Sequence, residues 1–273
     1  MVRALVLALT LVGVCLVGAC DGGESSDGEA GLDTDKVARV LTRAADDPSR
    51  ARRLLSGRAE GDLATEAQDA GIPTEDVVSW LLEDHGFPGE TSQAVADVLK
   101  IAAQPAAGSQ DEAVTAQVVA SPQVDPVLRP AVAGLLVDHV PEMMASVSTG
   151  EPWSRVDLAR LLAEVGGDPK TRVTLTTAIT DRAESRISSG ELGKDAATAQ
   201  VVLPTGWLVG AVDAGAMDGL DDGETRSLVD DRRLELETLA ENSALAAGQS
   251  DVQARAMSAE ISGAYSEGLG ATG

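Results

Sequence analysis

Apolar residues recur at helical spacing along most of the chain from residue 36 onward. Val37, Val40, Leu41 and Ala44 follow the i, i+3, i+4, i+7 pattern that places apolar side chains on one face of an α-helix. No stretch shows a convincing alternation of apolar and polar residues, which is the pattern of a half-buried strand. We therefore expect an all-α fold, a bundle of helices.

Asp-Pro pairs mark several of the expected helix starts. Asp47 can accept hydrogen bonds from free amides as an N-cap, and Pro48 suits the first helical position. Asp168-Pro169 repeats this arrangement. Asp125-Pro126 is a third such start, although Pro130 is placed to shift or kink its first turn.

The same criteria predict the remaining helices. In the first half, one helix is expected after the acidic residues 74–76 and two more at 91–103 and 111–120. The last helix of this half ends at Pro141. A loop at 146–153 separates the halves. In the second half the expected helices cover 171–189, 195–203, 207–217, 224–247 and 252–269.

The sequence pattern of residues 37–54 is repeated 121 residues later. Six of the 18 positions are identical to those of 158–175, including the Asp-Pro pair. Internal repetition of this kind predicts two tandem, duplicated helical modules, at 36–148 and 149–270. The alternative is that two unrelated helical corners happen to use the same capping residues.

The first 19 residues have the form of a secretory signal. Arg3 is followed by an uncharged run of about 14 residues, too short to cross a bilayer. The run ends in Val17-Gly18-Ala19-Cys20, which resembles the lipobox of bacterial lipoprotein signals. That resemblance implies cleavage before Cys20, lipidation of its sulfur and anchoring on the outer face of the cytoplasmic membrane. The alternative is a plain secreted protein.

Residues 20–35 read as an acidic, Gly/Ser-rich linker after the lipidated cysteine. Cys15 lies within the expected signal, so the mature chain keeps Cys20 alone. A disulfide within that chain, thiol catalysis and a cysteine-based zinc site are thereby excluded. With a net charge of −23, binding to nucleic acid is disfavoured. Aromatic residues make up only 2% of the chain, so Ala, Val and Leu must fill the core.

Few residues have the pattern of a chemical site. His85 stands at an expected helix end, and His139 lies on an apolar stripe as a hydrogen-bonded core residue. The acidic turn at 218–224 lacks the ligand positions of a calcium loop and is better interpreted as a helix cap. The G-x-G-x-x-G at 268–273 follows a helix and ends the chain, unlike a dinucleotide site. We expect no metal and no cofactor.

The three tryptophans could pack or bind. Trp80 and Trp207 begin similar apolar runs in the two halves, and core packing is the stronger interpretation. Trp153 lies in the loop between the halves. It could staple that loop to the next helix, and it is also the best candidate for an exposed contact with a partner.

Five segments carry a resemblance to a helical domain family of unknown function from actinobacteria, often labelled as having tetratricopeptide-like regions. They read DDPSRARRLL, VVSWLLEDHGFPGE, VLRPAVAGLLVDHVPE, WSRVDLARLLAEVGGDPKTRVTL and GWLVGAVDAGAMDG, in that order. The 34-residue tetratricopeptide spacing is absent, so we reject that label. The resemblance implies a helical fold and supplies no catalytic residues.

These features favour a lipid-anchored, non-enzymatic interaction or scaffold protein of the cell envelope, held to the membrane through Cys20 and binding a protein partner. The alternative is an envelope hydrolase that uses the titratable cluster Glu83, Asp84 and His85. Capture of a small solute would call for two α/β lobes, and no βαβ pattern is present.

Overall fold

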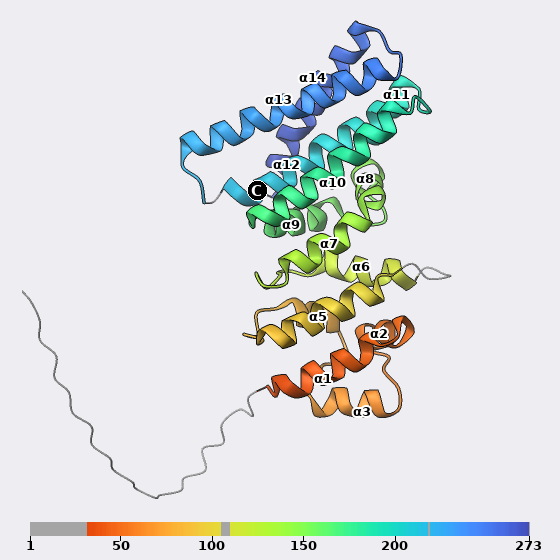
Figure 1. Cartoon of the computed structure of the whole chain (residues 1–273), viewed down its shortest axis with the longest axis vertical. Coiled ribbons are helices and arrows are strands. Elements are labelled where there is room, and N and C mark those ends of the chain that lie inside the picture. The colour runs from red at the N-terminus through yellow and green to blue at the C-terminus, as the bar shows by residue number, and fades with distance from the viewer. Residues whose placement is uncertain (1–31, 105–109, 218, 273) are drawn as a thin grey trace, which may run out of the picture. The chain divides into compact units, whose positions relative to one another are not determined.

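The computed structural model describes residues 32–104, 110–217 and 219–272, and the regular structure in these ranges is helical throughout (Figure 1). The predicted all-α fold is confirmed. The predicted signal at 1–19, the lipidation site Cys20 and the linker as far as residue 31 lie outside the described residues.

The helices follow one another in chain order. They are α1 (Thr34–Ala45), α2 (Pro48–Leu55), α3 (Asp62–Asp69), α4 (Val77–Leu82), α5 (Gly89–Ala102), α6 (Gln110–Ala120), α7 (Arg129–Asp138), α8 (Val140–Thr149), α9 (Arg155–Gly166), α10 (Pro169–Ser188), α11 (Lys194–Ala197), the π-helical turn η1 (Thr198–Val202), α12 (Leu203–Met217), α13 (Asp222–Ala246) and α14 (Asp251–Leu269).

Two of the Asp-Pro starts are confirmed. The Asp47 carboxylate accepts a hydrogen bond from the amide of Arg50, at 2.9 Å, and Pro48 occupies the first turn of α2. Asp168 caps α10 in the same way and accepts from the amide of Thr171 at 2.9 Å. At α1 the cap is Asp33, so the helix starts at Thr34 and includes the last two residues of the predicted linker.

The third Asp-Pro start was wrong. Asp125 accepts from the amide of Val127 within a turn, and α7 begins at Arg129. Because proline has no amide hydrogen, Pro130 fits the first turn of a helix and sets the start of α7 there.

Two further boundaries differ from the sequence prediction. Pro141 does not merely close a helix, since it occupies the first turn of α8, which runs to Thr149 through part of the predicted loop. The helices predicted at 195–203 and 207–217 are not separate either. The turn η1 joins them into one continuous run from α11 to α12.

The helices of the two halves make corresponding contacts. With a shift of 121 residues, α1 and α2 correspond to α9 and α10, and α5 corresponds to α12. In the first half α1 and α2 pack on α5, and in the second half α9 and α10 pack on α12. This correspondence supports the duplicated-module interpretation, which stays a prediction.

Glycines account for the clearest difference between the halves. After α2 the backbone turns at Gly57 and Gly61, whose φ angles are +67° and +60°. Such angles are costly for residues with a Cβ atom. Ala178 and Arg182 stand 121 residues later, and there the helix continues, so α10 is 20 residues long where α2 has eight.

Both halves contribute to one hydrophobic core. A continuous cluster of buried apolar residues extends from Val37 to Tyr265, and residues 32–273 form one compact unit. Alanine, valine and leucine supply most of this cluster, as the composition predicts. Among the described residues, no helix is both long enough and apolar enough to cross a membrane.

The helix α12 makes unusually close backbone contacts on two sides. A Cβ atom placed at Gly210 would lie 2.2 Å from the carbonyl oxygen of Tyr265 on α14, and one at Gly268 of α14 would lie 2.1 Å from that of Trp207. A Cβ at Gly215 would lie 1.7 Å from the carbonyl oxygen of Ala163 on α9. Only glycine fits at these positions without moving a neighbouring helix.

We predict that Gly210→Ala destabilises the protein, because its methyl group would force α12 and α14 apart. Overpacking costs about 1–3 kcal/mol, and occasionally more, which outweighs the gain of about 1 kcal/mol in helix propensity. Gly263→Ala on α14 is the matched control, since a Cβ there meets no atom within 4 Å. Urea unfolding followed by circular dichroism should show a loss for the first variant and a small gain for the second. Equal stability of the two variants would contradict the packing argument.

Candidate functional site: a groove between α10 and α13

The residue predicted as an exposed contact is buried. Trp153 is only 4% exposed, and its backbone amide donates a hydrogen bond to the hydroxyl of Ser146, at 3.2 Å. Its ring meets that of His139 edge-on, with centroids 6.1 Å apart. The chain after α8 folds back over that helix, so the exposed-contact interpretation was wrong. The alternative of a loop stapled by Trp153 fits these contacts.

The cluster at Glu83–His85 closes the end of a helix. The Nε2 atom of His85 lies 2.6 Å from the carbonyl oxygen of Trp80 in the last turn of α4, as the helix-end interpretation predicts. The imidazole also packs against the rings of Trp80 and Phe87, with centroids 4.6 and 5.0 Å away. Asp84 accepts from the amide of Gly86. His85 and Asp84 are thus held by local structural contacts.

The structure also tests the interpretations of His139 and of the acidic turn at 218–224. His139 is largely buried, with its Nε2 atom 3.2 Å from the hydroxyl of Thr115, as expected for a core histidine. Asp221 caps α13 and forms a capping box with Glu224, in agreement with the cap interpretation of the acidic turn. Across the described ranges, no group of three or more His, Cys, Asp or Glu side chains is arranged to hold a metal ion.

The clearest candidate for a binding surface is a groove between α10 and α13, which lie side by side (Figure 1). Two neighbouring hollows follow one another along α13 and share Glu235 and Leu239. We call the pair the α10–α13 groove. It is lined by Val173, Thr176, Thr177, Thr180 and Glu184 of α10 and by Arg232, Leu234, Glu235, Leu236, Thr238, Leu239, Asn242 and Ser243 of α13.

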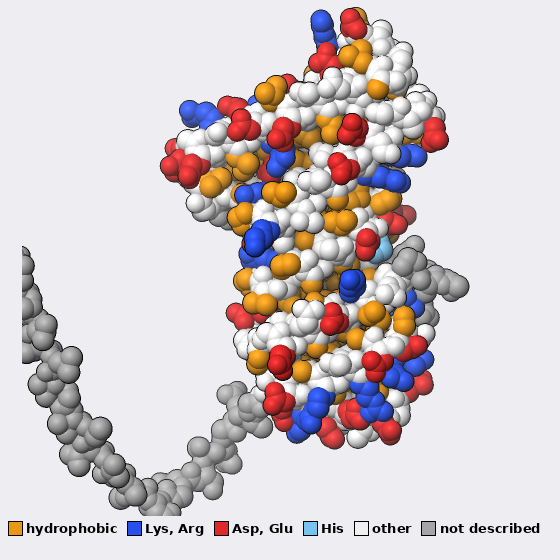
Figure 2. All heavy atoms as spheres, viewed as in Figure 1, with side chains coloured by type: hydrophobic (Ala, Val, Ile, Leu, Met, Phe, Trp, Pro, Cys, Tyr) orange, Lys and Arg blue, Asp and Glu red, His pale blue; other side chains and the backbone are white. Residues whose placement is uncertain are grey.

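Apolar side chains of this groove are unusually exposed. Val173 is 60% exposed and Leu234 is 64% exposed, whereas Leu236 on the same helix as Leu234 is buried. Hydrophobic, acidic and basic side chains are interspersed over the face that carries α10 and α13 (Figure 2). Contiguous apolar patches edged by polar residues mark protein-binding surfaces, so these two exposed side chains on adjoining helices make this face a candidate.

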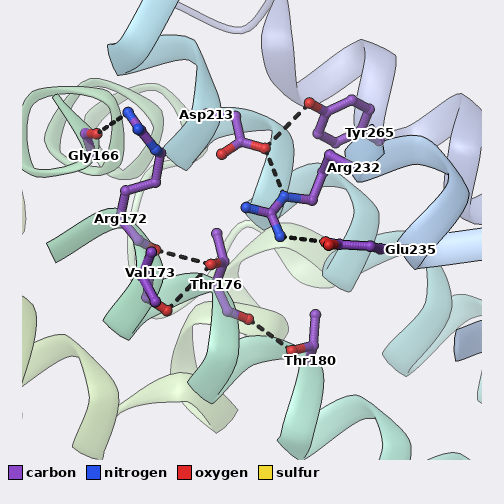
Figure 3. A network of polar contacts seen from close by, with 9 residues as sticks. All are labelled: Gly166, Arg172, Val173, Thr176, Thr180, Asp213, Arg232, Glu235 and Tyr265. Carbon is purple, nitrogen blue, oxygen red and sulfur yellow. Dashed lines mark hydrogen bonds and ion pairs between the residues drawn. The ribbon is translucent and has the colours of Figure 1, made fainter. Parts of the chain in front are cut away.

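Two of the three α10 threonines in the lining donate their hydroxyl protons to the backbone of their own helix. The Thr176 hydroxyl donates to the carbonyl oxygen of Arg172, at 2.9 Å, and the Thr180 hydroxyl donates to that of Thr176, at 2.9 Å (Figure 3). A hydroxyl carries a single proton. These two side chains therefore offer no hydrogen-bond donor to a ligand in the groove.

A buried polar network lies beneath one end of the groove and joins three helices (Figure 3). Asp213 of α12 is fully buried, and its Oδ2 atom accepts from the Nε of Arg232, at 3.0 Å, and from the hydroxyl of Tyr265, at 3.2 Å. Arg232 belongs to α13 and Tyr265 to α14. A second guanidinium nitrogen of Arg232 donates to Glu235 at 2.6 Å, which links the network to the groove.

Burial sets the protonation behaviour of this network. Loss of solvent raises the pKa of the Asp213 carboxyl group above its usual value, and the Arg232 guanidinium opposes that rise. Burial and the nearby carboxylate raise the pKa of Tyr265 as well, so its phenol keeps the proton that it donates. The other carboxylate oxygen of Asp213 is buried without a hydrogen-bond partner among the described residues.

Sequence reasoning did not single out Asp213. The sequence does mark this position, because Asp213 is the one charged residue of α12, whose other residues are apolar or small (LPTGWLVGAVDAGAM). A charge within such a helix needs a partner when it is buried. The sequence does not reveal, however, that Arg232 and Tyr265 are the residues that supply it.

Comparison with family models, curated proteins and solved structures gave no match to this chain. The resemblance to an actinobacterial helical family therefore stays a prediction, and the groove must be interpreted from its own residues.

We predict that Arg232→Gln destabilises the protein by about 3 kcal/mol at neutral pH, because it removes the cation that is hydrogen-bonded to the buried Asp213 carboxylate and leaves only the weaker charge interaction with Arg172. The pKa of Asp213 in the folded variant then lies still further above 3.8, the value for a free carboxyl. A carboxyl group whose pKa is higher in the folded state than in the unfolded state stabilises the folded protein at pH values below 3.8. This stabilisation is lost as the pH rises through the pKa of the folded state. The loss of stability caused by Arg232→Gln should therefore be smaller at pH 5 than at pH 7.

Urea unfolding at both pH values measures this effect. Arg226→Gln is the matched control, since it removes the same charge from an exposed position on α13. A pH-independent deficit, or an equal deficit in the control, would show that Arg232 does not neutralise Asp213.

Proposed function

We propose that this protein is a lipid-anchored component of the cell envelope that acts by binding another protein and has no catalytic role. The observation that carries the binding role is the α10–α13 groove, where Val173 and Leu234 keep more than half of their side-chain surface exposed. Single exposed apolar residues are ordinary on protein surfaces. Here Val173 and Leu234 line two adjoining hollows, one each, on neighbouring helices.

The sequence supports the location. The lipobox at Val17–Cys20 supplies an anchor, and the acidic stretch DGGESSDGEAGLDTD supplies a linker of low hydrophobicity before the helical body. Two acyl chains are enough for stable membrane attachment. The predicted position is the outer face of the cytoplasmic membrane, where the helical body can reach a partner in the envelope.

The chemistry of the groove favours packing over catalysis. The Asp213 carboxylate is buried beneath the groove, where it accepts hydrogen bonds from Arg232 and Tyr265. A general base must come within hydrogen-bond reach of its substrate. The hydroxyls of Thr176 and Thr180 are bonded to the helix backbone, which leaves neither as a ready nucleophile.

We predict that Cys20→Ala releases the protein from the membrane fraction and abolishes incorporation of labelled palmitate, because the variant has no acyl anchor. Cys15→Ala is the matched control, since that cysteine precedes the predicted cleavage site and should leave both properties unchanged. Palmitate in the Cys20→Ala protein would contradict the anchor assignment.

We also predict that a photo-crosslinking amino acid at Leu234 traps a discrete partner in living cells. Val252 is the matched control, because it is 79% exposed on α14 and does not line the groove. The expected result is an adduct of defined mass from position 234 that position 252 does not form. The interaction role would be refuted by identical adduct patterns at the two positions, or by no adduct at either.

A further inference from the structure

We infer that the α10–α13 groove binds a basic amphipathic helix of the partner protein. This inference rests on the proposed function and specifies the chemistry of the partner at the same site.

The groove has the length and form of a helix-binding site. Its lining runs from Val173 to Glu184 on α10 and from Arg232 to Ser243 on α13, which is three turns of each helix. At a rise of 1.5 Å per residue each row is about 17 Å long. The two rows run in the same direction, since residues early in α10 share a hollow with Arg232 and Glu184 shares one with Ser243. A third helix can pack into such a channel between two others.

The floor and rims of the groove favour a partner that presents a stripe of apolar side chains. Val173, Leu234 and Leu239 present apolar surface from both sides, and the backbone-bonded hydroxyls of Thr176 and Thr180 add no donors. An amphipathic helix loses no backbone hydrogen bonds on docking, because these are made within the helix, and its apolar positions at i, i+3, i+4 and i+7 meet the groove.

The charge of the groove favours basic residues on both sides of the apolar stripe of that helix. Arg232 is the one cation in the described lining, and it is shared between the Asp213 and Glu235 carboxylates. Glu184 on the opposite rim adds a further negative charge. The site therefore has more carboxylates than guanidinium groups, and lysine or arginine beside the apolar stripe of the partner would balance them.

The same charge argues against two other occupants. A second copy of this chain would bring a net charge of −23 to an acidic groove. The linker at Asp21–Asp35 is itself acidic and has almost no apolar residues. Both would meet like-charge repulsion in the groove, and the linker would also supply little apolar surface.

Two synthetic helices of 14 residues test the inference. Both carry leucine at i, i+3, i+4, i+7 spacing, and one has lysine and the other glutamate at the flanking positions. Their binding to the full-length lipidated protein in detergent micelles is measured by fluorescence anisotropy. Wild-type protein should bind the lysine helix about tenfold more tightly than the glutamate helix, since two exposed ion pairs replace two repulsive contacts.

Charge reversal in the groove provides the decisive comparison. Glu184→Lys/Glu235→Lys should lose that preference and bind the glutamate helix more tightly. Glu60→Lys/Asp69→Lys makes the same change in net charge at exposed positions outside the groove and should keep the wild-type preference. If circular dichroism shows that the double groove variant is misfolded, Glu184→Lys alone should reduce the preference about threefold.

A helix preference that is the same in wild-type and groove variants would overturn the basic-helix inference, as would equal binding of both helices. Leu234→Gln must also weaken binding of the lysine helix severalfold, because the contact is apolar as well as ionic. If these tests fail while the crosslinked adduct at position 234 persists, the binding role stands and only the partner chemistry is wrong. Loss of that adduct would instead refute the proposed function.

Discussion

The close backbone contacts of α12 with α9 and α14 are the constraint on which the arrangement of the second half depends. Gly210 and Gly268 let α12 and α14 approach until a single added methyl group would overlap a carbonyl oxygen, and Gly215 does the same toward α9. A chain with few aromatic residues cannot fill wide gaps between helices with large rings. Reducing the gap with glycine achieves the close packing that protein interiors require.

That packing brings a carboxylate into the core, and the carboxylate in turn positions the groove. Asp213 faces α13 and α14 from α12, where Arg232 and Tyr265 satisfy one of its oxygens. An ion pair this deeply buried is a poor source of stability compared with apolar packing, yet removal of either partner is costly. The pair therefore acts best as a register device, because Arg232 can reach Asp213 of α12 only when α13 lies where it does. The groove against α10 follows from that placement.

Local sequence signals predicted the helical character of the fold well and some helix boundaries poorly. Asp47, Asp168 and Asp221 cap the expected helices because capping depends on neighbours within a few residues. Pro126 and Pro141 were misjudged because a proline can stand in a turn, end one helix or start the next, and tertiary packing decides among these. The expected shift of the first turn by Pro130 agrees with the start of α7 at Arg129. Trp153 was misjudged for a related reason, since only the path of the loop over α8 shows that its ring is covered.

The groove itself was beyond sequence reasoning. The exposed apolar side chains of Val173 and Leu234 lie on helices that the pattern predicted, but the packing of these helices against each other depends on contacts between segments some 60 residues apart. Hydrogen exchange of the intact protein tests most directly whether α12 is the fixed element beneath this surface. The account predicts that the amides of Gly206–Gly215 exchange slowest, at the rate of global unfolding, while those of α1 to α3 exchange sooner. Exchange of α12 before those N-terminal helices would contradict it.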